Sequence, residues 1–79
     1  MNVYPEDFLD KFEVYTGTFL NSDIKGLCDM KSVLKDNGFL LRTKYYASLG
    51  ATAVRAIRPK GNREASKEDL EIMKDWVKF

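Results

Sequence analysis

Two hydrophobic periodicities compete in the first part of the chain. After Pro5, apolar side chains between residues 8 and 15 recur at helical spacing, and a proline suits the first turn of a helix because an N–H there has no partner. Residues 11–20 also alternate, and their β-branched and aromatic side chains are typical of a strand. We therefore predict a short helix over residues 5–11 that leads into a strand over residues 12–20.

The next segment has the apolar stripe of an amphipathic helix, with recognisable signals at both ends. Ser22 is a good N-cap with Asp23 in the first turn, and Asn37-Gly38 supplies the left-handed ending that helices often need. The stripe lies at helical spacing and consists of Ile24, Leu27, Met30 and Leu34. We predict a helix between these two signals.

A β-hairpin is predicted in the middle of the chain. Residues 39–47 and residues 51–58 each alternate between two sets of side chains, which is the period of a strand. The tripeptide Ser48-Leu49-Gly50 is a natural turn between them. Pro59 ends the second strand because it has no N–H to donate to a ladder.

A capping box marks the beginning of a last helix. Ser66 is followed three residues later by Asp69, so each side chain can accept a hydrogen bond from the other residue's backbone. The residues that follow place Leu70, Met73 and Val77 on one face. We expect this helix to run almost to Phe79.

These elements predict an α+β fold in which residues 1–79 form a single domain. The simplest arrangement is a three-stranded antiparallel sheet with two helices packed on one face, in the order β-α-β-β-α after a short N-terminal helical turn. The opposite face of the sheet would then be exposed. Arg42, Lys44 and Tyr46 would share that exposed face if the residues between them point inward.

Length and composition are consistent with a small folded protein. The chain has 79 residues, of which 44% are hydrophobic and 32% are charged. A chain of this size buries roughly 60% of the surface that it exposes when unfolded. Because so small a core would gain from association through a strand edge, we expect a homodimer as one mode of assembly.

The chain lacks the residues on which most catalytic and metal sites depend. It has no histidine, and its single cysteine, Cys28, has neither a disulfide partner nor a histidine to activate it. We expect Cys28 to be a small buried hydrophobic residue. Because no motif for a metal, nucleotide or other cofactor is present, we predict a protein that is not an enzyme and has no catalytic residues, no metal and no cofactor.

Targeting signals are also missing from the sequence. Residues 1–10 lack the basic region of a signal peptide, and no apolar run approaches the ~20 residues that span a bilayer. We therefore expect a cytoplasmic protein without a membrane partner.

The net charge of +1 conceals a strongly basic middle segment. Residues 25–63 carry nine Lys and Arg against two Asp, whereas both flanking segments are net acidic. Cations at strand spacing can follow a phosphate backbone, and a tyrosine ring can stack on an unpaired base. The candidate binding residues on the predicted hairpin and the loop after it are Arg42, Lys44, Tyr46, Arg55, Arg58, Lys60 and Arg63.

Two binding functions follow from this charge pattern. The first is contact with RNA or single-stranded nucleic acid rather than duplex DNA, because no predicted helix has the basic face of a major-groove reader. The alternative is contact with a larger protein, since segregated charge and an unpaired strand edge also serve protein recognition. In that case the chain would be an inhibitor or adaptor, of the kind that phages and other mobile elements encode to block a host enzyme. A third interpretation involves no ligand: the basic residues form a solvent-exposed sheet face whose charge complements the acidic ends of the chain.

The predicted order of elements resembles that of small double-stranded-RNA-binding-like domains, including the HicA toxin family. The resemblance covers residues 24–79 and consists of a helix that ends in Asn37-Gly38-Phe39, then strands, then a C-terminal helix. HicA-type toxins use a histidine in the strand region, and this chain has none. Ribonuclease activity is therefore not implied, and the resemblance does not establish membership of a family.

Overall fold

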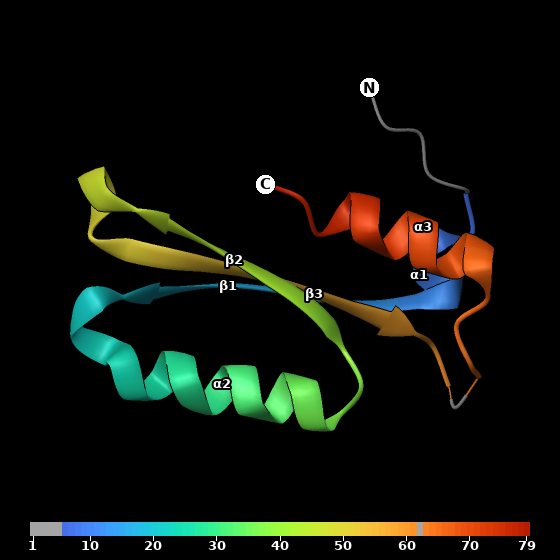
Figure 1. The fold of residues 1–79 in the computed structure, drawn as a ribbon, viewed down its shortest axis with the longest axis horizontal. Helices are drawn as coiled ribbons and strands as arrows, with labels where there is room; N and C mark the ends of the chain where they lie inside the picture. Colours follow the sequence, from blue (N-terminus) through green and yellow to red (C-terminus); the bar gives the residue numbers. More distant parts are fainter. Residues whose placement is uncertain (1–5, 62) are drawn as a thin grey trace.

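Three strands pair in one antiparallel sheet, with β3 in its centre (Figure 1). Both β1 and β2 pair antiparallel to β3, so they run in the same direction. The strand order is β1-β3-β2, and the bounds are Phe12–Leu20 for β1, Leu40–Tyr46 for β2 and Ala51–Pro59 for β3. Two strands that run in the same direction need a crossover between them, and the helix between β1 and β2 supplies it.

Helical segments precede, connect and follow these strands. The computed structural model describes residues 6–61 and 63–79, and the helical segments within them are α1 (Phe8–Lys11), the 3-10 turn η1 (Asn21–Asp23), α2 (Ile24–Asp36), the 3-10 turn η2 (Ala47–Leu49) and α3 (Lys67–Trp76). The predicted α+β class and the three-stranded antiparallel sheet are confirmed, as is the strand over residues 12–20. The predicted start of the first helix at Pro5 lies outside the described residues.

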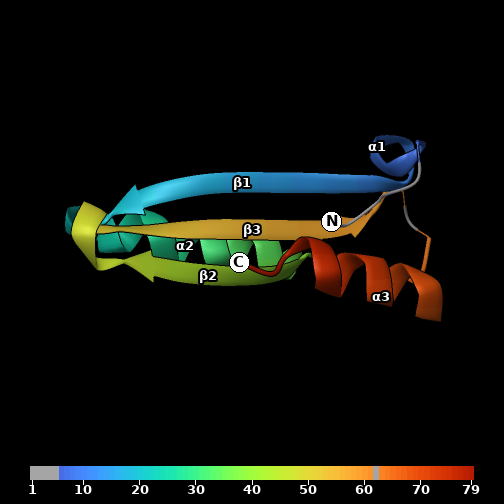
Figure 2. The same ribbon diagram turned by 90° about the horizontal axis from the view of Figure 1, so that it is seen from above.

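The helices α2 and α3 cover opposite faces of the sheet (Figures 1 and 2). Leu34 of α2 packs in one cluster with Val54 and Ala56 of β3, whereas α3 packs in another cluster that contains Ile57. Ala56 and Ile57 are adjacent in an extended strand, so their side chains point to opposite sides of the sheet. The central strand β3 is therefore buried from both sides.

The prediction that both helices pack on one face of the sheet is therefore wrong. Each helix has an apolar face that could cover either side of a sheet, so its own sequence does not say which. The choice is made in β3, where Val54 and Ala56 bury one side and Ile57 buries the other, and all three are fully buried. Phe12 of β1 and Met73 and Val77 of α3 complete the core on the Ile57 side.

Local hydrogen bonds mark both ends of helix α2. The Asp23 carboxylate accepts a hydrogen bond from the Gly26 N–H at 3.1 Å, so the N-cap is Asp23 and not Ser22, which lies in η1. At the other end Gly38 has φ +79°, and the Phe39 N–H donates to the Leu34 carbonyl at 3.0 Å. This is the left-handed ending that the sequence predicts.

The hairpin and the capping box occur where the sequence places them. In the hairpin Leu40 pairs with Ile57 and Tyr46 pairs with Ala51, with η2 and a left-handed Gly50 between the strands. At α3 the Ser66 and Asp69 side chains each accept a hydrogen bond from the other's backbone N–H. Both predictions are confirmed.

The sheet is longer than the helix that covers its Ile57 side. Helix α3 lies over one end of that side, near the beginning of β2 and the end of β3 (Figure 2). Beyond α3 the strands carry side chains that are exposed or half-exposed on the same side. We call this part of the sheet the open face; its residues are Thr16, Thr18, Arg42, Lys44, Tyr46, Ala53 and Arg55.

Candidate nucleic-acid interface

The open face carries cations from two neighbouring strands and no acidic strand residue. Arg42, Lys44 and Tyr46 alternate along β2, and Arg55 of β3 lies directly opposite Arg42. The strand positions on this side of β1 are Thr or apolar, and Glu13 points to the other side together with its partner Arg58. The strand positions of the open face therefore carry three cations and no carboxylate.

The Arg55 guanidinium is held in place by the C-terminal residues that follow α3. Its Nη1 donates a hydrogen bond to the Lys78 carbonyl at 2.7 Å. The guanidinium also lies over two aromatic rings, 4.6 Å from the centroid of Trp76 and 5.7 Å from that of Phe79. Arg55 is thus a pre-oriented cation at the border between α3 and the open face.

The cations on β2 make only local contacts, within their own strand. Arg42 donates to the carbonyl of its neighbour Leu41 at 2.9 Å. The Lys44 ammonium lies over the ring of Tyr46, 5.2 Å from the centroid. A base could stack on that side of Tyr46 once Lys44 turns towards a phosphate.

Arg42 and Arg55 bring two positive charges to directly opposite positions of β2 and β3. They are directly opposite on adjacent antiparallel strands, where side chains are about 5 Å apart at Cβ. Like charges at such positions destabilise a sheet. The effect is similar in size to the roughly 0.2–1 kcal/mol by which opposite charges stabilise one. An anion that binds between the two guanidinium groups would remove this repulsion.

Arg58, a third arginine of the predicted site, lies on the α2 side of the sheet. Its Nη2 forms an ion pair with the Glu13 carboxylate at 3.0 Å, and its Nη1 donates to the Asn37 carbonyl at 2.6 Å. The guanidinium also covers the ring of Phe39 at 4.6 Å. These contacts tie β1, β3 and the end of α2 together, so Arg58 has a structural role.

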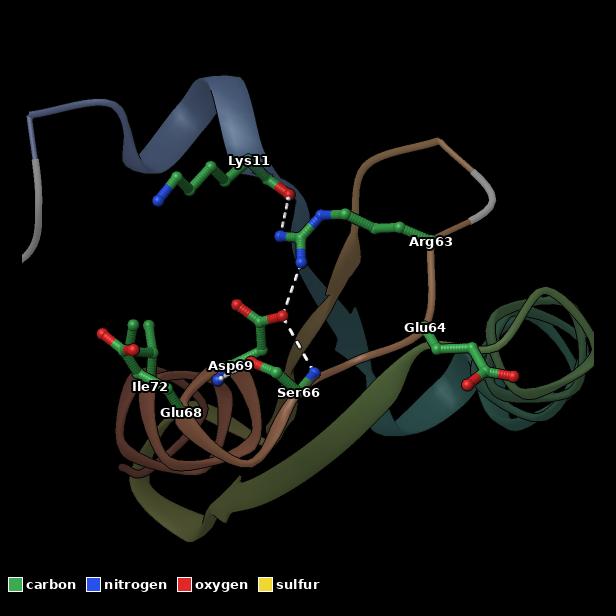
Figure 3. A pocket seen from close by; sticks show the side chains of 7 residues that line it. All are labelled: Lys11, Arg63, Glu64, Ser66, Glu68, Asp69 and Ile72. Carbon is green, nitrogen blue, oxygen red and sulfur yellow. Dashed lines mark hydrogen bonds and ion pairs between the residues drawn. The ribbon is translucent and has the colours of Figure 1, made fainter.

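Arg63 lies in a polar cavity at the beginning of α3 (Figure 3). Its guanidinium bridges the Lys11 carbonyl, at 2.9 Å, and the Asp69 carboxylate, and it packs on the ring of Phe12. The neighbouring Lys60 donates to the Leu9 carbonyl at 2.9 Å. The cavity has a volume of about 430 Å³, and its lining residues are Lys11, Arg63, Glu64, Ser66, Glu68, Asp69 and Ile72.

Asp69 is the charged centre of this cavity. It is 9% exposed, and the Ser66 backbone N–H, followed by the Arg63 guanidinium, holds the pKa of its carboxyl below the ordinary value, although burial opposes the shift. The cavity therefore contains acids as well as cations, and its best-placed cation is already paired. It links α1, the loop before α3 and the beginning of α3, and it is not part of the open face.

The seven predicted binding residues therefore do not form one patch. Arg42, Lys44, Tyr46 and Arg55 share the open face, whereas Arg58 lies behind the sheet and Lys60 and Arg63 lie at its end. The position of Trp76 and Phe79 beside Arg55 is not predictable from the sequence, because it depends on α3 packing on the open-face side. Cys28, expected to be buried, is exposed on α2.

Comparison of the chain with protein-family models, curated protein sequences and solved structures gives no match. Across residues 6–61 and 63–79, no helix combines the length and the apolar character that crossing a membrane requires. The same described residues contain no cluster of three or more potential metal-ligating side chains. The open face is accordingly interpreted from its own geometry and charge.

Proposed function

We propose that this protein binds single-stranded nucleic acid, RNA in particular, through the open face. The observation that carries the proposal is a sheet surface with Arg42, Lys44 and Arg55 on adjacent strands, an aromatic ring beside them, and no carboxylate on the strands of that side. Phosphate contacts from Arg and Lys supply most of the affinity of such proteins, and aromatic rings supply stacking.

Each residue of the open face has a separate role in this proposal. Arg42 and Arg55 hold one phosphate between them, which converts their mutual repulsion into two favourable contacts. Lys44 is two residues further along β2, about 6.7 Å away at 3.3–3.4 Å per residue, and contacts a neighbouring phosphate. Tyr46 then offers its ring to an unstacked base.

An open sheet surface favours a single strand over a duplex. Duplex DNA is usually read by a helix or a β-ribbon that enters the major groove, whereas the open face is one surface of a three-stranded sheet. An extended strand of RNA can lie across the sheet with its phosphates towards the cations and its bases towards the tyrosine. The affinity should therefore be greater for a single strand than for a duplex of the same length.

The test compares two charge reversals of equal size. In Arg42→Glu/Lys44→Glu, fluorescence anisotropy with a labelled single-stranded RNA should show that binding is lost. The matched control is Lys31→Glu/Lys35→Glu on α2, which changes the net charge equally but lies behind the sheet, and it should retain binding. Circular dichroism confirms that both variants are folded. Equal weakening by both variants, or binding by the first, would refute the open face as the binding surface.

A protein partner is the second candidate, and a separate observation favours it. At the end of the sheet where η1 and η2 meet, Leu20, Ile24 and Leu49 are 62%, 67% and 69% exposed. The Asn21 N–H donates to the Gly50 carbonyl at 2.8 Å and joins the two turns. Exposed apolar side chains at one end are typical of a docking site. A partner that co-purifies stoichiometrically after nuclease and salt treatment would support this function, and loss of that partner in Leu49→Ser would locate it.

A further inference from the structure

The outer edge of β1 lacks the features that normally protect a strand edge. Within the described residues the sheet ends at β1, and its pairing with β3 continues without a bulge from Phe12 to Leu20. The seven residues Val14–Leu20 include no charged residue and no proline. Natural proteins use lysine, proline or bulges to prevent unwanted pairing at such edges. The β1 edge is therefore suited to pairing with another strand.

The backbone groups that point outward can be identified from the two ends of the ladder. The Lys60 N–H donates to the Lys11 carbonyl at 2.7 Å, and the Asn21 N–H donates to the Gly50 carbonyl at 2.8 Å. Antiparallel partners alternate between hydrogen-bonded and non-bonded pairs, so the odd-numbered residues of β1 bond to β3. The outward N–H and C=O groups belong to Val14, Thr16, Thr18 and Leu20.

The side chains of this edge are symmetric about Gly17. On either side of Gly17 stand a threonine, then an aromatic residue, then an aliphatic residue, in the order Val14-Tyr15-Thr16-Gly17-Thr18-Phe19-Leu20. In a two-fold antiparallel pair centred on Gly17, Thr16 lies opposite Thr18 of the second copy, Tyr15 opposite Phe19 and Val14 opposite Leu20. Thr–Thr and aromatic–aromatic cross-strand pairs are favourable, and no charge meets a charge.

We infer that two copies of this chain associate through their β1 edges, antiparallel and centred on Gly17. The outward backbone groups then satisfy one another, since Thr16 and Thr18 of opposite copies form a hydrogen-bonded pair, as do Val14 and Leu20. Val14 and Leu20, which are 38% and 62% exposed, gain apolar neighbours. Gly17 meets Gly17 at the axis in a non-bonded pair, the closer of the two types of pair.

The other edge of the sheet does not offer the same pairing. On β2, a two-fold pair centred on Thr43 would place Arg42 opposite Lys44 of the second copy, and like charges directly opposite each other are destabilising. A β1 edge on a β2 edge would leave one free edge on each copy and would continue into a filament. Pairing of β1 with β1 therefore gives a closed dimer.

Helix α1 limits the length of the shared ladder but leaves this run accessible. It lies next to the first residues of β1 (Figure 2), and Phe12, the first residue of the strand, is buried under it and α3. The run from Val14 to Leu20 lies beyond that contact. The two-fold axis is perpendicular to the sheet, so both open faces lie on the same side of the dimer.

The experiment uses two double variants of the full chain that differ in one charge sign. Light scattering on the wild type should give twice the chain mass of 9.1 kDa. Thr16→Lys/Thr18→Lys places Lys opposite Lys at both symmetric pairs and should give a monomer. Thr16→Lys/Thr18→Glu places Lys opposite Glu at the same pairs and should remain a dimer. Thr43→Lys on β2 is the control and should also remain a dimer.

A monomeric wild type would overturn the inference, as would a dimer of the Lys/Lys variant. If Lys/Glu and Lys/Lys were both folded monomers, pairing centred on Gly17 would be wrong. Thermal unfolding followed by circular dichroism distinguishes a folded monomer from an unfolded chain. This inference does not depend on the proposed function, because oligomeric mass and RNA binding are measured separately.

Discussion

Replacing Asp69 with alanine is the substitution whose cost can be worked out most directly from the structure. The carboxylate accepts the Ser66 N–H at 3.0 Å and the charged Arg63 guanidinium. A hydrogen bond to a charged group contributes about 1.5–3 kcal/mol, and a helix cap contributes about 1 kcal/mol. Arg63 is partly exposed and keeps its bond to the Lys11 carbonyl, which favours the lower part of this range. We expect a loss of about 2–3 kcal/mol in the free energy of unfolding.

The pH dependence gives this prediction a second readout. Since the folded-state pKa of Asp69 lies below its ordinary value, the unfolded chain binds more protons than the folded chain as the pH falls through about 4. The stability that Asp69 contributes is therefore fully present above that pH and is lost as the pH falls towards the folded-state pKa. The difference between wild type and Asp69→Ala should shrink accordingly.

Urea unfolding, which leaves ion pairs unscreened, measures both effects. Wild type, Asp69→Ala and Asp69→Asn are compared at pH 7 and at pH 3, with the m-value checked for two-state behaviour. Asp69→Asn removes the charge but keeps an acceptor for Ser66, so its loss should be smaller than that of alanine. A cost below about 0.5 kcal/mol at pH 7, or a cost that is the same at pH 3, would refute the role that we assign to the Arg63–Asp69 contact.

Two further predictions address the helix ending and the open face. Gly38→Ala should lower the free energy of unfolding by about 1–2 kcal/mol in a urea titration, because φ at this position is +79°. The control Ser32→Ala, at an exposed position of α2, should change the free energy little. Equal stability of the two variants would contradict the role of Gly38. For RNA binding, three contacting cations predict a slope of about −2 for the logarithm of the binding constant against the logarithm of salt concentration. Lys44→Ala should reduce the magnitude of that slope by about 0.7, and an unchanged slope would show that Lys44 contacts no phosphate.

Elements with local signals were predictable from the sequence. The ending at Gly38, the capping box at Ser66 and the turn before Gly50 each depend on residues within four or five positions of one another. Local hydrogen bonds and backbone conformations determine such features, so sequence spacing is sufficient. The N-cap of α2 was placed one residue early because Ser22 and Asp23 are both good caps and only the turn η1 decides between them.

The candidate site was only partly predictable. Arg55 and Arg58 are three residues apart in one strand, and an odd separation places them on opposite sides of a sheet. This parity is present in the sequence, and it divides the predicted site between the two sides of the sheet. The pairing of Arg42 with Arg55 depends on the hairpin register, and the support of Arg55 by Trp76 depends on where α3 packs.

The sequence by itself determined the α+β class, the strand segments and most helix boundaries, because these follow from periodicity, capping and turn residues. Only the tertiary structure decided that α2 and α3 cover opposite faces, that β3 is central and that Arg58 and Arg63 form ion pairs. These features result from contacts between residues far apart in the chain, such as Arg58 with Glu13 and Arg63 with the Lys11 carbonyl. An alternating strand shows that two sets of side chains point in opposite directions, but which set faces a helix depends on how the whole core packs.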